Sequence, residues 1–146
     1  MNTENNFAHL YTELSLNPDL PTLAERCKLL TEILLDCTSL PQTQPVCRCL
    51  GAYLEEMKYG LKESMRDFQV VEFEDEVEQP RQKEWLLEDT ETMCDYCRAL
   101  NHILLVSHFD RDMLPHLTGL LHDITHSMAA DVAAPQSTKT VIHINS

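Results

Sequence analysis

The chain has 146 residues, the length of a single domain, and its 43% hydrophobic and 24% charged residues are the balance of a globular protein. Its formal net charge is −13, with only 11 Lys and Arg, which argues against a surface that grips nucleic-acid phosphates. The longest apolar run, ILLV at 103–106, is far shorter than the roughly 20 residues that a membrane-spanning helix needs.

The N-terminal sequence MNTENNF has neither the basic start nor the apolar core of a secretory signal. We therefore expect a cytosolic protein, in which cysteines stay reduced. The sequence then predicts six free thiols and not a disulfide framework: Cys27, Cys37, Cys47, Cys49, Cys94 and Cys97.

Apolar residues recur at steps of three and four, which predicts helices through most of the chain. A first helix over 3–15 is stopped by NPDLP at 17–21. Thr22 and Glu25 have the spacing of a capping box, so a second helix is predicted to begin there. Its apolar stripe ends at Cys37.

LPQTQP at 40–45 predicts a loop before a third helix over 46–67. The residues of this third helix that are expected to point inward are Val46, Leu50, Tyr53, Met57, Leu61 and either Met65 or Phe68.

The next segment, 70–81, alternates apolar residues with glutamates at a nearly strict period of two. That period is typical of a strand. Because no partner strand is evident, the segment is interpreted as an extended acidic linker.

A fourth helix is predicted over 82–107 and a fifth over 113–128. The apolar stripe of the fourth, with the three residues that widen it, is Leu86, Met93, Cys97, Leu100, Leu104, Trp85, Tyr96 and Ile103. A polar segment that contains Pro135 then predicts a flexible tail.

Short connections favour antiparallel neighbours. The predicted fold is therefore all-α: an antiparallel helical bundle of four to five helices with a disordered C-terminal tail. The bundle is expected to be one domain over 1–130, with the acidic linker 70–81 inside it and the tail at 131–146.

Cys94 and Cys97 lie three residues apart within the predicted fourth helix. A redox pair normally sits at a helix N-terminus, where the helix dipole lowers the thiol pKa, so a redox role is disfavoured. A zinc site that also used Cys47 and Cys49 is the functional alternative, because zinc takes four Cys or His ligands. The other interpretation is that these thiols are small apolar residues of the helix wall.

His122 and His126 are one helical turn apart and could ligate a metal. The zinc-protease pattern, however, needs Glu after the first His, and the chain has Asp123 there. These histidines are interpreted as the solvated boundary of an amphipathic helix.

Acidic residues are densest between Glu72 and Glu91. This strip is interpreted either as a solvated segment or as a docking site for a basic partner. The candidate partner-binding residues within it are Glu72, Glu74, Asp75, Glu76, Glu78 and Trp85.

No phosphate-binding glycine loop, serine-nucleophile motif or di-iron Glu-x-x-His motif is present in the sequence. We therefore expect a non-enzymatic, small acidic cytosolic regulatory or adaptor protein that acts by protein–protein interaction, with a basic or apolar partner surface or a second copy of itself. Tyr53, Met57 and Tyr59 are further candidate contact residues. The alternatives are a zinc- or thiol-dependent sensor and an acidic protein that mimics DNA.

Overall fold

A computed structural model describes the backbone of residues 3–74 and 78–145, with side chains described for 7–64 and 89–133. Within these residues the fold is all-α, as predicted. The elements are α1 (Thr3–Leu14), α2 (Leu20–Leu35), α3 (Leu40–Glu74), α4 (Glu78–Val106), the 3-10 turn η1 (Arg111–Met113) and α5 (Leu114–Asn145).

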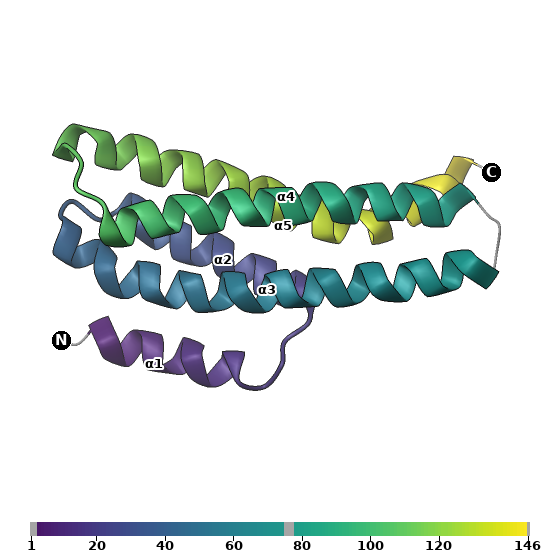
Figure 1. The fold of residues 1–146 in the computed structure, drawn as a ribbon, viewed down its shortest axis with the longest axis horizontal. Coiled ribbons are helices and arrows are strands. Elements are labelled where there is room, and N and C mark those ends of the chain that lie inside the picture. The colour runs from purple at the N-terminus through teal and green to yellow at the C-terminus, as the bar shows by residue number, and fades with distance from the viewer. Residues whose placement is uncertain (1–2, 75–77, 146) are drawn as a thin grey trace.

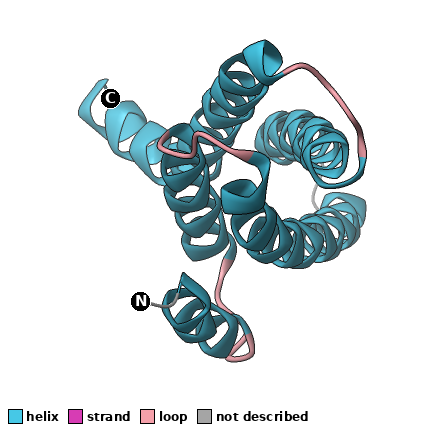
Figure 2. Ribbon diagram, turned by 90° about the vertical axis from the view of Figure 1, so that its left-hand side faces the viewer, coloured by secondary structure: helices cyan, strands magenta, loops and turns pink. Residues whose placement is uncertain are grey.

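Four of the helices form an antiparallel bundle in which α2 packs on α3, α3 on α4, α4 on α5 and α5 back on α2 (Figure 1). The helix α1 packs against α3 from outside this ring. The end-on view shows α1 apart from the ring of four helices (Figure 2). The predicted antiparallel helical bundle is therefore confirmed.

The core is made by the apolar stripes that the periodicity predicted. In α3 the predicted inward residues Val46, Leu50, Tyr53, Met57 and Leu61 are all buried, and the side chains of Met65 and Phe68 lie outside the described part. In α2 the stripe is buried as far as Leu34, and Cys37 is half-buried after the helix has ended. Burial of such stripes contributes roughly 25 cal/mol for each Å² of apolar surface, which is what holds the helices together.

The start of α2 differs from the prediction. Asp19, not Thr22, is the N-cap, and its carboxylate accepts a hydrogen bond of 3.0 Å from the Thr22 backbone N–H. The capping box expected at Thr22 and Glu25 is therefore wrong. Aspartate is among the strongest N-capping residues, and Pro21 fits the first turn because it needs no N–H partner there.

The predicted loop at 40–45 is wrong as well, because α3 already begins at Leu40 and includes Pro45. Proline is tolerated in the opening turns of a helix, where it removes only a hydrogen bond to a carbonyl close to the helix end. That carbonyl belongs to Pro41, which is exposed.

Helix also replaces the extended conformation predicted for 70–81, since α3 continues to Glu74 and α4 begins at Glu78. An isolated strand leaves its backbone N–H and C=O groups without partners, whereas a helix satisfies them internally. Residues 75–77 lie outside the described part of the chain.

At the other end, α5 continues to Asn145 across most of 131–146. Helical geometry does not measure flexibility, so the flexible tail stays a prediction.

Tyr53 fixes α1 to the bundle. Its ring is fully buried, and its hydroxyl donates a 2.6 Å hydrogen bond to the backbone carbonyl of Leu10 in α1. Glu13 and Arg26 add a two-pronged ion pair between α1 and α2, with N–O distances of 2.7 and 2.8 Å.

Tyr53→Phe is expected to lower the free energy of unfolding by about 1–2 kcal/mol, because the Leu10 carbonyl then stays buried without its donor. Urea unfolding of the full chain measures this change in the free energy of unfolding. Tyr59→Phe is the matched control, since Tyr59 lies on the same helix and is 63% exposed. Equal stability of the two variants would contradict the role assigned to the Tyr53 hydroxyl.

Candidate functional site

The four cysteines predicted as zinc ligands are all buried, but they lie at different levels of the α3–α4 interface. Asn101 donates a 2.9 Å hydrogen bond to the Cys47 carbonyl, and the Cys94 thiol lies 3.5 Å from the Leu54 carbonyl. These contacts fix an antiparallel register in which Cys94 is level with Leu54 and therefore about two helical turns from Cys47.

Among the described side chains, no group of three His, Cys, Asp or Glu residues lies close enough to hold a metal ion. The structure thus does not assemble Cys47, Cys49, Cys94 and Cys97 into one ligand set. The physical reason is that all four face a packed apolar core from different positions along two helices.

Burial also keeps these thiols protonated at neutral pH. It raises the pKa of Cys47, Cys94 and Cys97 to about 12 and that of Cys49 to about 11. The pKa of Cys27 is raised further in the same direction by its complete burial. Since the thiolate is the nucleophile and the metal ligand, the chemistry of these residues matches the interpretation as apolar wall.

Asn101 is one of the buried polar residues that the sequence reasoning missed. It is 3% exposed, and its Nδ2 lies 3.1 Å from where a Cβ on Gly51 would be. Its Oδ1 has no hydrogen-bond partner among the described residues. A glycine at position 51 therefore gives the Asn101 amide room to approach α3 and reach the Cys47 carbonyl.

Charged side chains line the edge of the same interface. Lys58 of α3 lies 3.2 Å from Glu91 and 2.7 Å from Asp95 of α4, and Arg98 lies 2.8 Å from Glu55. Such partly exposed pairs contribute at most about 1 kcal/mol each, so they select the register more than they stabilise the fold.

The histidines do not converge on a site. His122 is half-buried and lies 3.9 Å from Glu32 in α2, while the exposed His126 has its ring centre 6.0 Å from that of His122. His102, five residues after Cys97, is exposed. The pattern is that of a helix boundary, as the sequence indicated.

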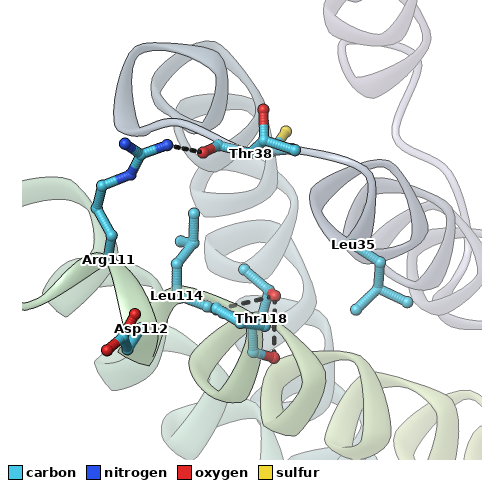
Figure 3. A pocket seen from close by; sticks show the side chains of 8 residues that line it. Leu35, Thr38, Arg111, Asp112, Leu114 and Thr118 are labelled. Carbon is cyan, nitrogen blue, oxygen red and sulfur yellow. Dashed lines mark hydrogen bonds between the residues drawn. The ribbon is translucent and has the colours of Figure 1, made fainter.

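A pocket of about 580 Å³ opens where the α2–α3 connection meets the start of α5 (Figure 3). Leu35 enters it from α2 and Leu114 from α5, while the Arg111 guanidinium donates a 3.3 Å hydrogen bond to the Thr38 carbonyl. The Thr118 hydroxyl bonds to carbonyls of its own helix, at Leu114 and Pro115. Arg111 and Thr118 are thus engaged with the chain itself, and the pocket does not define a ligand.

The six candidate partner-binding residues of the acidic strip lie outside the described side chains. Glu72, Glu74 and Glu78 are placed by their helical backbone only, Asp75 and Glu76 lie in the undescribed segment, and the side chain of Trp85 is among those not described. Docking or DNA mimicry by this strip stays a prediction.

The other candidate contact residues lie on opposite sides of α3. Tyr53 and Met57 belong to the core, whereas Tyr59 is 63% exposed at the rim of a hollow of about 330 Å³ between α3 and the start of α2. Only Tyr59 of these three is therefore accessible to a partner.

Helix α4 contradicts one detail of the predicted core. Tyr96 and Ile103 were expected to widen its buried stripe, but they are 57% and 37% exposed, and Val106 is 60% exposed. Their spacing of seven and three residues places them on one helix face. A projection centred on Cys94, Cys97 and Asn101 would have shown that this face points outward.

No protein-family model, curated protein or solved structure matches this chain. Within the described residues, no helix has a stretch long and apolar enough to cross a lipid bilayer.

Alkylation of the native protein near neutral pH is expected to modify Cys37 quickly and the other five cysteines only after denaturation. Cys37 is half-buried, whereas the others are buried in the core. Intact mass spectrometry after iodoacetamide counts the adducts, and Cys37→Ser is expected to remove the fast one. A fast adduct mapped to Cys94 or Cys97 would contradict the packed-thiol interpretation.

Alkaline pH is expected to destabilise the fold through the same thiols. Folding raises the pKa of the Cys97 thiol from the ordinary 9.0 to about 12, so the folded state favours the protonated thiol. The stabilisation that results is complete below about pH 9 and is lost as pH rises towards 12. Urea unfolding at about pH 8 and about pH 11 measures the loss. The loss should be smaller in Cys97→Ala, and an unchanged loss in this variant would contradict the assignment.

Proposed function

We propose that this protein is a small acidic regulatory or adaptor protein that acts by binding another protein, not by catalysis, in the cytosol. The observation that supports the proposal is the outward apolar face of α4, formed by Tyr96, Ile103 and Val106. Clustered exposed apolar side chains mark binding surfaces, and aromatic residues are enriched at the centres of such surfaces.

The neighbouring helix extends this support. Met113 and Leu120, from η1 and α5, are 46% and 49% exposed. Large apolar side chains left in water on two adjacent elements have an unfavourable hydration free energy, which a bound partner would relieve. The cytosolic location agrees with thiols that are packed in the core as apolar groups.

Site-specific photo-crosslinking in cells tests the proposal. A photoreactive phenylalanine replaces Tyr96 in one variant and Tyr59 in a second, because both are exposed tyrosines on different helices. The expected result is a defined crosslinked polypeptide from position 96, whose purified form then binds the full chain. Crosslinks from position 59 alone would keep the proposed function and move its surface to α3. The absence of a binding polypeptide at both positions would contradict the proposed function.

A further inference from the structure

The side of α4 that faces α5 is fixed by exclusion. Asp95 and Arg98 mark the side towards α3, through their ion pairs with Lys58 and Glu55. In the described part of the chain α4 packs on α3 and α5 and on no other helix. The opposite side, with half-buried Leu100, therefore faces α5.

The corresponding side of α5 follows in the same way. The hydroxyls of Thr31 and Thr125 lie 2.9 Å apart between α2 and α5, which marks the side of α5 towards α2. Half-buried Leu117 and Ile124 lie about a quarter turn round α5 from Thr125, and since the long helices that α5 packs on are α2 and α4, we infer that they face α4.

The levels of the two helices can also be matched. The connection between the two helices runs from Val106 to Leu114. Asp89 lies as many residues before Val106 as Asp131 lies after Leu114, so these two residues are level in an antiparallel pair. Burial, with a smaller effect from the charge of Asp89, raises the pKa of Asp131, and the proximity of these two residues agrees with this antiparallel register. By the same spacing, Leu100 is level with Leu120.

Exposed apolar residues border this interface on both helices. Tyr96 and Ile103 stand beside Leu100 on α4, at steps of four and three, and Leu120 stands three residues from Leu117 on α5. Together they form what we call the α4/α5 surface, which consists of Tyr96, Leu100, Ile103, Met113 and Leu120, all exposed except the half-buried Leu100.

The charged side chains that border this surface are acidic. Between Arg98 and Lys139 the sequence contains a single Lys or Arg, Arg111, whose guanidinium bonds to the Thr38 carbonyl at the end of the bundle. Asp123 is exposed on α5, and Asp89 and Asp131 lie at the far end of the surface. An apolar strip bordered by carboxylates complements a helix with an apolar face and basic edges.

We propose that the α4/α5 surface binds one amphipathic helix of a partner protein, with apolar side chains on its inner face and Lys or Arg along its edges. This inference rests on the proposed function and names the partner's binding element. A second copy of the chain fits this surface less well, because its own α4/α5 surface is bordered by Asp residues and offers no Lys or Arg along its edges.

The test uses the full chain and a synthetic peptide of about 18 residues, roughly five helical turns, with Leu on one face and Lys at its edges. Fluorescence anisotropy of the labelled peptide gives its Kd. Two double variants are compared with the unaltered chain: Ile103→Ser with Leu120→Ser on the surface, and Leu29→Ser with Leu35→Ser on α2. All four side chains are between 37% and 49% exposed, and none of the changes alters the net charge of −13.

The expected result is that the unaltered chain binds the peptide, that the α4/α5 variant binds at least about tenfold more weakly, and that the α2 variant binds within about twofold of the original. A second peptide with Glu in place of Lys should bind at least about tenfold more weakly, and Asp89→Asn with Asp131→Asn should narrow that difference. Circular dichroism of each variant checks that the helices remain.

Equal weakening by both double variants, or no binding by the unaltered chain, would overturn the inference. A dimer in sedimentation velocity that the α4/α5 changes dissociate would assign the surface to a second copy and overturn it too. A crosslinked partner found through position 59, with no peptide bound at the α4/α5 surface, would refute this inference alone and leave the proposed function standing.

Discussion

The register between α3 and α4 is the constraint on which the rest of the structure depends. It is set where the Asn101 amide reaches the Cys47 carbonyl over Gly51, and it is repeated at the edge by Lys58 and Asp95. The apolar stripes supply most of the stabilisation, but apolar contacts alone tolerate a sliding of one helix along the other by a turn. Such a slip would raise the free energy of the fold, because the buried polar groups and the paired charges would lose their partners.

Two consequences follow from this register. The thiols of the two helices face the core at different levels, where burial suppresses their ionisation and packing makes them part of the wall. The rotation of α4 that buries Cys94 and Cys97 also turns Tyr96 and Ile103 outward, next to α5. The same packing thus accounts for the burial of the core cysteines and for the exposed apolar face of α4. The function proposed for the protein uses this exposed face.

Much of the fold could be predicted from helical periodicity, because burying one stripe per helix is the main source of stability. The inward residues of α3 were predicted correctly for this reason. The N-cap at Asp19 and the helix start at Leu40 were missed, since capping and tolerated prolines are decided by a few local hydrogen bonds. The helical backbone at 70–74 was missed because alternating glutamates mimic the period of a strand.

The candidate site was less predictable than the fold. Cys94 and Cys97 have the spacing of a ligand pair, and only the three-dimensional arrangement shows that Cys47 lies too far along α3 to join them. Asn101 carried no motif, because its role depends on a residue 50 positions away at Gly51. The α4/α5 surface likewise needed the mutual register of two helices, which a single sequence does not contain.

Nuclear Overhauser contacts of the Asn101 side-chain amide test the α3–α4 register most directly. The account predicts strong cross-peaks from these amide protons to the Hα protons of Gly51, because Nδ2 lies 3.1 Å from the position of a Cβ there. Cross-peaks to the Hα proton of Leu54 in place of Gly51 would show a register shifted by about one turn. That result would contradict the separation of the thiols and the outward face of α4 together.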